Sequence, residues 1–373
     1  MLTIAREWGR IGVVGFGGPP AHIALLRELT VERRRWISAH RFEDAIAACN
    51  LLPGPASTQL SIFCAWTLRG APGALVGGAA FILPGLIAIL GLSVLFLSSP
   101  PDWIKGAGGG AGAAVAAVAL HAGSTLIGPS RERAASLARW AAYVAAGFIA
   151  SATVGPWVVL VLVGSGLVEL GFQRRTRPAL GQHAWPLLVA LVAAISGGVG
   201  ALVWVAFKVG ALSYGGGFVI VPLMQRDAVD TYQWMTDAEF LNAVALGQVT
   251  PGPITHTVAV VGWAAGGTGG ALLAAAVAFA PSFLLVLAGA RHFEALRANR
   301  DAQAFLGGAG PAAIGAILGA SISLALALTE GWQWGVLAGA TVALLVLRLG
   351  VVTTLLGAAA VGTAAVLLGA SVP

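Results

Sequence analysis

The chain has 373 residues, of which 58% are hydrophobic and 10% are charged, and its mean hydropathy is +0.87. This composition excludes a soluble globular domain, because such domains carry about 25% charged residues. The formal net charge is +6, but the arginines stand in short loops between apolar runs, where they set membrane orientation and do not indicate nucleic-acid binding. We therefore expect an all-α polytopic membrane protein in contact with lipid, whose 52 glycines allow close helix packing.

The first distinctive motif is a glycine-rich turn, Gly15-Phe16-Gly17-Gly18-Pro19-Pro20. Glycines at this density let backbone N–H groups converge on a ligand, and a helix that starts there points the positive end of its dipole at the ligand. We predict that Gly17 and Gly18 contact an anion. Arg10, inside the preceding apolar run, either marks an ion pathway or anchors the N-terminus. His22 is either a proton relay or a hydrogen-bond partner.

A helix break follows at Asn50-Leu51-Leu52-Pro53-Gly54-Pro55. Proline cannot donate a backbone hydrogen bond, so this sequence interrupts a helix inside an apolar run. Broken backbone at membrane depth persists only where protein or a water-filled cavity satisfies the freed N–H and C=O groups. We predict an internal site here, with contributions from Asn50, Pro53, Gly54, Pro55, Ser57 and Thr58, and with Gln59 and Ser61 beside them.

Apolar runs of about 20 residues, enough to cross a bilayer as helix, recur from end to end. We expect spans near 72–97, 106–128, 138–154, 156–173, 186–206, 269–290, 307–328, 332–349 and 351–370. The chain is expected to divide into an N-terminal repeat at 1–177, a linker at 178–184 and a C-terminal repeat at 185–373.

An internal repeat supports this division. An offset of 198 residues pairs Trp36 with Trp234 and Pro53-Gly54-Pro55 with Pro251-Gly252-Pro253 without a gap, and it gives 12 identities in the 44 positions from 12 to 55. A composition rich in small residues gives some matches by chance, but not a tryptophan and an intact Pro-Gly-Pro in one register. The two halves therefore repeat one structural plan.

The second half carries its own set of candidate binding residues. They are Lys208, Tyr214, Gly215, Gly216, Gly217, Gln248, Thr250, Pro251, Gly252, Pro253, Thr255 and His256. Neutral hydroxyl, amide and glycine N–H donors suit an oxyanion, because they replace its hydration without holding it too tightly. The alternative for each hydroxyl is a helix cap or a bond to a neighbouring helix. Lys208 is either part of the pathway or extends to the membrane interface, and His256 is either a proton relay or a hydrogen-bond partner.

The loops predict opposite orientations for the two halves. Residues 27–41 hold five arginines and two glutamates, whereas 225–239 hold one arginine and four acidic residues. The positive-inside rule then places the first loop in the cytoplasm and the second outside. The remaining basic clusters all fall inside if 42–68 and 240–266 are re-entrant hairpins that turn at Pro-Gly-Pro. The alternative is a full crossing by 42–68, which places some of these clusters outside.

Several motifs together carry a family resemblance. They are Phe16-Gly17-Gly18-Pro19 with His22, the Arg-rich stretch through Trp36, Leu52-Pro53-Gly54-Pro55, Phe81-Ile82-Leu83-Pro84-Gly85, the stretch from Gly210 to Gly217, and the stretch from Gly247 to Pro253. This set resembles the chromate ion transporter family. The resemblance implies an inner-membrane carrier that expels chromate, with sulfate as a mimic, and two homologous halves of opposite orientation. Pro20 and Phe218 depart from the repeat, so the two walls of the site are not chemically identical.

The resulting prediction is a secondary transporter that exports chromate across the inner membrane of a bacterial-type cell and so confers chromate resistance, by alternating access between inverted repeats. Chromate or sulfate is the expected solute, protons are a candidate coupling ion, a homodimer is a candidate assembly, and no cofactor or metal is expected. No acidic residue stands clearly within a span, which favours an anionic solute. The alternatives are a carrier of sulfate or another oxyanion, a passive anion channel, and a redox enzyme that uses Cys49 or Cys64.

Overall fold

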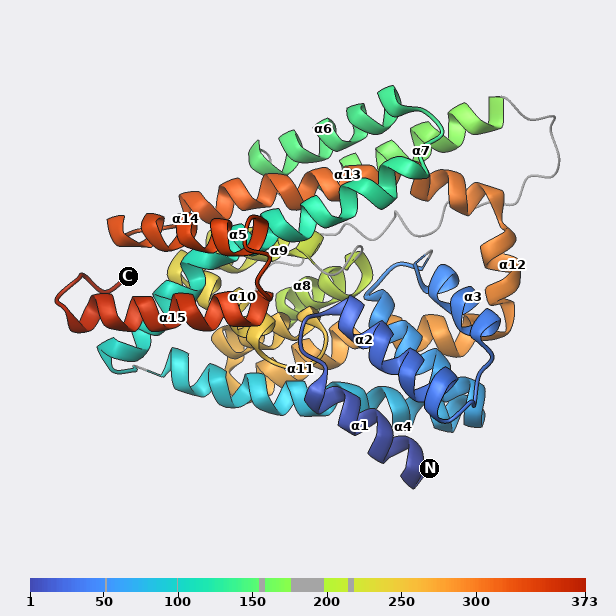
Figure 1. The fold of residues 1–373 in the computed structure, drawn as a ribbon, viewed down its shortest axis with the longest axis horizontal. Helices are drawn as coiled ribbons and strands as arrows, with labels where there is room; N and C mark the ends of the chain where they lie inside the picture. The colour runs from blue at the N-terminus through green and yellow to red at the C-terminus, as the bar shows by residue number, and fades with distance from the viewer. Residues whose placement is uncertain (51, 99, 154–157, 176–197, 214–217) are drawn as a thin grey trace.

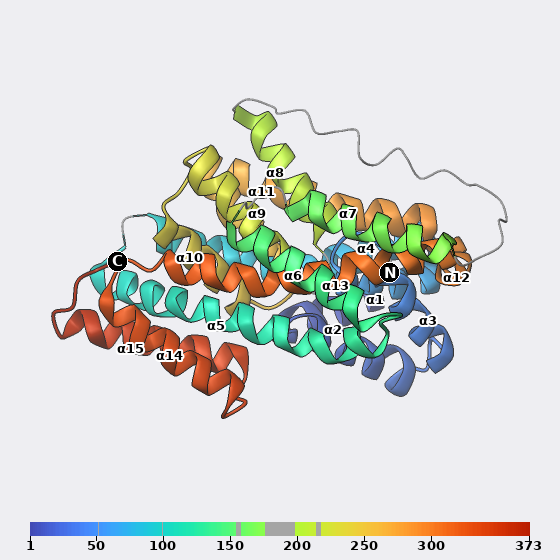
Figure 2. The ribbon, with the colours of Figure 1, turned by 90° about the horizontal axis from the view of Figure 1, so that it is seen from above.

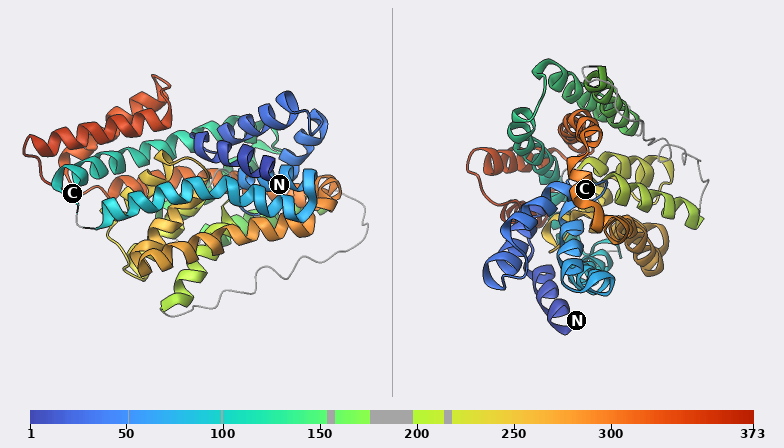
Figure 3. Two further views of the ribbon diagram at one scale, coloured as in Figure 1. Left: turned by 90° about the horizontal axis from the view of Figure 1, so that it is seen from below. Right: turned by 90° about the vertical axis from the view of Figure 1, so that its right-hand side faces the viewer.

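The computed structural model describes residues 1–50, 52–98, 100–153, 158–175, 198–213 and 218–373. Within these residues every regular element is helical, which confirms the expected all-α class. Long helices run roughly along the longest axis of the molecule, with the N-terminal helices at one end and the C-terminal pair at the other (Figures 1 and 3).

The helices of the first half have the following bounds: α1 Leu2–Val14, α2 Pro19–Arg27, the π-helix η1 Glu28–Arg33, α3 Ala39–Cys49, α4 Ala56–Leu97, α5 Asp102–Glu132, α6 Leu137–Thr153 and α7 Val158–Arg175. Those of the second half are α8 Gly198–Leu212, η3 Phe218–Ile220, α9 Val221–Gln225, the π-helix η4 Arg226–Thr231, α10 Asp237–Val249, η5 Ile254–His256, α11 Thr257–Gly289, η6 Ala290–His292, α12 Phe293–Ala298, α13 Arg300–Leu326, α14 Gly331–Leu345 and α15 Val351–Leu367.

Helix α4 consists of two arms that fold back on each other. The backbone leaves the helical region at Arg69 and at Gly70, where φ is +60°. A Cβ atom at Gly77 would lie only 2.3 Å from Ala65 Cβ, whereas twelve residues of continuous helix would separate them by about 18 Å. Arms 56–68 and 71–97 are therefore antiparallel neighbours, and the predicted span 72–97 is the second arm.

Helix α11 reverses in the same way. Its non-helical residues are Gly266 and Gly267, and Gly267 also has φ +60°. A Cβ atom at Gly262 would lie 2.7 Å from Ala274 Cβ, so residues on either side of the reversal are in contact. The predicted span 269–290 follows this reversal as the second arm of α11.

A second reversal in each half lies at Pro-Gly-Pro. Helix α3 ends at Cys49 and α4 begins at Ala56, and a shallow pocket is lined by Arg41 and Asp44 from the start of α3 together with Phe63 and Trp66 from the end of the first arm of α4. The two segments thus run back along each other on either side of Pro53-Gly54-Pro55.

The corresponding segments of the second half pack likewise. Helix α10 ends at Val249 and α11 begins at Thr257. A Cβ atom at Gly247 would lie 2.0 Å from Thr257 Oγ1, so residues five positions before and after Gly252 are in direct contact.

The repeat is visible in the backbone itself. The π-helices at 28–33 and 226–231 differ by 198 residues at both ends. Arg35 and Gln233, also 198 apart, are two non-glycine residues with the same φ of 52°. The reversals at Gly70 and Gly267 are 197 apart, so one residue is lost between the Pro-Gly-Pro turns and the reversals. The same peptide plan is therefore folded twice.

The two halves exchange their last helices. Helices α6 and α7 of the first half pack on α13, and α14 and α15 of the second half pack on α5 (Figures 1 and 2). Small residues make these contacts close: a Cβ atom at Gly110 would lie 2.2 Å from the Ala358 carbonyl oxygen, and one at Gly308 would lie 2.1 Å from the Ser165 carbonyl oxygen. This use of glycine is what helices packed in lipid require.

Four helices of the described residues are long and apolar enough to cross a membrane, namely α4, α5, α11 with its flanking turns, and α13. Helices α8, α14 and α15 are apolar but shorter. The helices confirm the expectation of a membrane protein with several apolar segments. Helices α6, α7, α14 and α15 coincide with predicted spans to within a few residues, whereas most of the predicted span 186–206 and the whole linker 178–184 lie outside the described residues.

Candidate functional site

The first Pro-Gly-Pro turn rests on the second half of the chain. Gly54 has φ +114°, a left-handed conformation that favours glycine. A Cβ atom at this position would lie 3.2 Å from the Gly210 carbonyl oxygen and 3.5 Å from Ser282 Oγ. Gln59 Nε2 donates to the Pro53 carbonyl oxygen at 2.7 Å, so a side chain of the following arm closes the turn.

The second Pro-Gly-Pro turn rests on the first half. Gly252 has φ +97°, and its N–H donates to the Gly15 carbonyl oxygen at 2.9 Å. A Cβ atom at Gly85 would lie 2.1 Å from the Pro251 carbonyl oxygen and 2.7 Å from His256 Cε1. Each turn is thus seated on the helix that follows the reversal in the opposite half: the first turn on α11, the second on α4.

His22 joins the two turns. Its Nε2 donates to the Gly15 carbonyl oxygen at 2.9 Å, and its Nδ1 lies 3.2 Å from Ser57 Oγ. The Gly15 carbonyl therefore accepts from both His22 and Gly252. A continuous series of contacts leads from Ser57, just after the first turn, through His22 and Gly15 to the second turn, and so the two breaks lie in one region of the molecule.

Buried polar atoms without a hydrogen-bond partner flank both turns. They are Thr58 Oγ1, Gln59 Oε1, Ser61 Oγ, Gln248 Nε2, both ring nitrogens of His256, and Ser282 Oγ beneath the first turn. Buried groups of this kind cost free energy when they stay unpaired, and in native proteins such atoms call for an explanation. Hydroxyl, amide and imidazole groups gathered at two broken helices form the chemistry of a site for a small polar solute.

The predicted residues divide into those that meet at the turns and those that do not. Gly18 meets the second turn, because a Cβ there would lie 3.8 Å from Ile254 Cδ1. Those that share the two turns and their flanks are Pro53, Gly54, Pro55, Ser57, Thr58, Gln248, Pro251, Gly252, Pro253, Thr255 and His256. Thr250 Oγ1 instead donates to the Leu246 carbonyl oxygen of its own helix at 2.8 Å.

Six further predicted residues lie at the edge of the site or outside the described part. Asn50 is exposed as the C-cap of α3, and Gly17 is exposed just before α2. The glycine-rich turn of the second half, predicted to contain Tyr214, Gly215, Gly216 and Gly217, lies outside the described residues.

Lys208 forms an ion pair with a residue that belongs to neither turn. Its Nζ lies 2.5 Å from Asp227 Oδ2 in η4, and it stands 5.5 Å from the centroid of the Trp204 ring. Burial raises the pKa of the Asp227 carboxyl, while Lys208 and Arg226 act in the opposite direction. Arg10, at the equivalent position of the first half, is exposed. Neither cation meets the two turns through the contacts given above.

Sequence reasoning did not assign Gly15, Gly85, Gly210 and Ser282 to the site. Gly85 closes the Phe81-Ile82-Leu83-Pro84-Gly85 motif, and a shift of the repeat offset to 197 pairs it with Ser282 after Pro281. That one-residue change of register was the available signal. Cys49 and Cys64 are free and buried, and the described residues contain no group of three His, Cys, Asp or Glu that could hold a metal.

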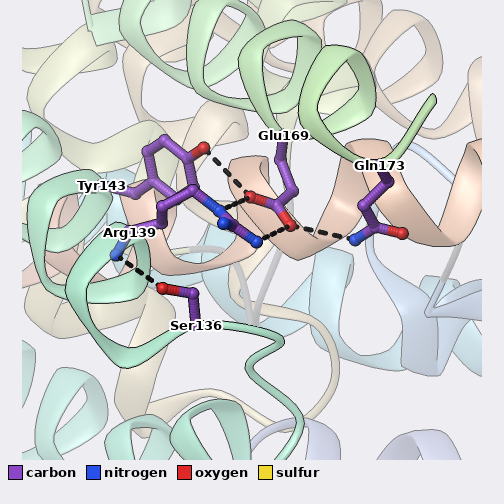
Figure 4. A network of polar contacts seen from close by, with 5 residues as sticks. All are labelled: Ser136, Arg139, Tyr143, Glu169 and Gln173. Atoms are coloured by element: carbon purple, nitrogen blue, oxygen red, sulfur yellow. Dashed lines mark hydrogen bonds and ion pairs between the residues drawn. The ribbon is translucent and has the colours of Figure 1, made fainter. Parts of the chain in front are cut away.

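A separate polar network ties α6 to α7 (Figure 4). Arg139 donates through Nε and Nη2 to Glu169 at 2.8 and 3.2 Å, and Tyr143 Oη and Gln173 Nε2 donate to the same carboxylate at 3.1 and 3.0 Å. Both oxygens of this buried carboxylate are occupied by protein donors. The network therefore locks two helices together and does not offer a binding site.

The comparisons with known proteins agree with this architecture. A family model described as Chromate transporter matches residues 2–170 and 200–363. A chromate transport protein of Cupriavidus metallidurans is 32% identical over 90% of this chain and 85% of the relative, and one of Pseudomonas aeruginosa is 30% identical over 86% and 80%. A probable chromate transport protein of Synechococcus elongatus is 29% identical over 87% and 84%. No solved structure matches. The chain belongs to the chromate transporter family.

Proposed function

We propose that this protein is a secondary transporter that carries chromate across the inner membrane, with the oxyanion held between the two Pro-Gly-Pro turns. The observation that carries the proposal is their reciprocal seating. Gly54 packs against Gly210 and Ser282 of the second half. In the second turn, the Gly252 N–H donates to the Gly15 carbonyl oxygen, and the Pro251 carbonyl oxygen packs against Gly85 of the first half. A movement of one half against the other must reshape both turns together, which is the requirement for alternating access.

The solute is a tetrahedral oxyanion. The unpaired buried groups at the turns are neutral hydroxyl, amide and imidazole groups, which can replace the hydration of an oxyanion by hydrogen bonds. Relatives of this chain are named chromate transport proteins, and we assign chromate on that ground. Sulfate is a dianion of the same shape and is the expected competitor.

Inverted orientation of the halves belongs to the same proposal. The arginine-rich loop at 27–41 and the acidic loop at 225–239 support opposite sides of the membrane. The contact of Gly247 with Thr257, and the shared pocket of Arg41 with Trp66, support re-entrant hairpins rather than straight crossings. Two hairpins from opposite leaflets would then meet at the turns.

The direction that we propose is export. A dianion leaving a cell whose interior is negative is driven by the potential with about 2.3 kcal/mol per charge per 100 mV. Export of this kind needs no further energy source and would lower the internal chromate concentration, which is the basis of resistance.

The test is radiolabelled chromate flux into everted membrane vesicles, with and without unlabelled sulfate and with an imposed potential. We expect saturable uptake that is faster with a positive vesicle interior and is reduced by sulfate. Flux that never saturates and shows no counter-transport would indicate a channel instead of a carrier. No flux above that of vesicles lacking the protein would reject the proposed function.

Topology has its own measurement. Cysteines are placed at Ser38 and Thr236, equivalent exposed residues in the loops that precede the two hairpins, in a chain whose Cys49 and Cys64 are replaced by serine, and are labelled with impermeant maleimides from each side. We expect labelling at position 38 only from the cytoplasmic side and at position 236 only from the outside. Labelling of both positions from the same side would contradict inverted halves.

A further inference from the structure

The first of the two buried histidines at the turns is fully engaged. His22 is 0% exposed. Its Nε2 faces the Gly15 carbonyl oxygen, which can only accept, so Nε2 carries the proton. In the neutral ring Nδ1 is then an acceptor, and Ser57 Oγ donates to it. Both nitrogens of His22 are used to hold the glycine-rich turn against the first arm of α4.

The second buried histidine is less constrained. His256 is also 0% exposed and lies beside the Ile82 backbone, but neither ring nitrogen makes a hydrogen bond of ordinary geometry. Its Cε1 would lie 2.9 Å from a Cβ at Gly252 and 2.7 Å from one at Gly85, and the Phe279 ring meets it edge-on with centroids 5.2 Å apart. An imidazole has one donor and one acceptor to satisfy, so its position against the second turn points to a ligand that engages this ring.

None of the described residues that these contacts place around His256 is a lysine or an arginine. The groups packed around it are the turn at 251–253, Ile82 and Gly85 of α4, Phe279 of α11 and His22 of α2. Among the described residues, His22 is the titratable side chain that faces it. Lys208 is paired with Asp227 elsewhere. A dianion in this place would lack a counter-charge, and burial of an uncompensated charge is costly.

From these observations we infer that His256 contacts the transported oxyanion and takes up a proton as the anion binds, whereas His22 only positions the glycine-rich turn. The inference rests on the proposed function, since it concerns how the same site holds its solute. Attraction between the anion and the imidazolium is mutual, so each raises the affinity of the site for the other by the same factor.

A proton carried on His256 lowers the net charge that crosses the membrane with each chromate. The proton comes from the solution on the loading side, binds one ring nitrogen of His256 and leaves with the anion on the other side. A loaded carrier then transfers about one negative charge for each chromate instead of about two, and the membrane potential drives export about half as strongly.

The matched variant is His256→Gln, because the first half carries a glutamine at the equivalent position. Gln59 and His256 are 197 residues apart, as are the two reversals.

The experiment measures proton uptake on chromate binding. Purified full-length protein in weak buffer at about pH 7.5 is mixed with chromate at the same pH, and the change in proton concentration is measured with an indicator dye. We expect about one proton taken up per bound chromate in the wild type and none in His256→Gln, with an affinity about 10-fold lower. The positioning variant, His22→Gln, should bind more weakly but still take up about one proton.

A second readout does not depend on the affinity of the variant. In proteoliposomes, the charge transferred per radiolabelled chromate should be about one for the wild type and about two for His256→Gln, with His256→Asn as the substitute if the glutamine variant does not insert. Wild-type protein that binds chromate without proton uptake overturns this inference and leaves the proposed function standing. Wild-type protein that binds no chromate overturns both.

Discussion

The two Pro-Gly-Pro turns have the same backbone but different neighbours. Both place a left-handed glycine on the opposite half of the chain, yet the side chain over Gly54 is Gln59, which donates to the turn itself. The side chain over Gly252 is His256, whose ring nitrogens make no hydrogen bond of ordinary geometry. The helix beneath the first turn offers Ser282, and the helix beneath the second offers Gly85. Duplication has therefore preserved the architecture, while the side chain over the turn glycine is a neutral amide in the first half and an imidazole in the second.

The helices exchanged between the halves, α6 and α7 on α13 and α14 and α15 on α5, make the same contacts in both halves. Gly110 of α5 against α15 and Gly308 of α13 against α7 make equivalent contacts, because a Cβ atom at either glycine would lie 2.1–2.2 Å from a carbonyl oxygen of the partner helix. Close backbone approach depends only on the lack of a side chain, so both copies keep it. These contacts between the two halves are symmetric, whereas the side chains around the two Pro-Gly-Pro turns differ.

The largest effect is expected from Gly85→Ala. The new methyl group would lie 2.1 Å from the Pro251 carbonyl oxygen, so the second turn must move off α4. Overpacking of this kind costs about 1–3 kcal/mol or more, and a barrier higher by about 2.7 kcal/mol slows transport about 100-fold. The rate of chromate flux into vesicles measures this loss. Gly91→Ala, an exposed position on the same arm with open space around it, is the control, and equal flux in both variants would show that the second turn is not on the path.

The second prediction compares the loss of transport rate caused by alanine at each of the two turn glycines. Alanine at Gly252 or at Gly54 strains a left-handed backbone by about 1–2 kcal/mol. At Gly252 the methyl also meets the His256 ring at 2.9 Å, whereas at Gly54 it meets the end of the flexible Gln59 side chain at 2.8 Å. Gly252→Ala should therefore reduce the transport rate several-fold more than Gly54→Ala. An equal loss in the two variants would remove the asymmetry between the turns.

A third comparison concerns stability. Gly110→Ala and Gly308→Ala each place a methyl group within 2.2 Å of a carbonyl oxygen on an exchanged helix. We expect both to lower the unfolding free energy by a similar amount, about 1–3 kcal/mol, measured by thermal unfolding in detergent. Gly357→Ala, exposed on α15 with nothing close, should have little effect. Destabilisation by one of the two alone would argue against an equivalent exchange.

The smallest effect is expected from Lys208→Ala. Sequence reasoning predicts weaker transport, and the ion pair with Asp227 gives a specific route: the variant leaves a largely buried carboxylate without its partner. We expect a few-fold loss of flux that is restored in the double variant Lys208→Met with Asp227→Asn. A double variant as defective as the single one would instead place Lys208 in the transport path.

The sequence predicts the helices of the fold better than it predicts the contacts around the two turns. The position of most helices follows from apolar runs bounded by glycine and proline, and these were found to within a few residues. The predicted boundaries between 68 and 72 and between 266 and 269 coincide with the reversals at Gly70 and Gly267, but the close packing of the two arms on either side of each reversal depends on the tertiary structure. The residues near Pro-Gly-Pro were correctly expected to be buried, as Ser57, Thr58 and Thr255 are, but their partners on α4 and α11 come from remote positions that no local pattern marks.

Taken alone, the sequence determined the class, the repeat, the two helix breaks and the family resemblance, because hydropathy and the conformational limits of proline and glycine act locally. Only the tertiary structure decided that each break rests on the opposite half, that the last two helices of each half are exchanged, and that His22 is fully hydrogen-bonded while His256 is less constrained. Those facts depend on contacts between residues far apart in the chain, and hydrogen-bond partners of a buried histidine are fixed by such contacts alone.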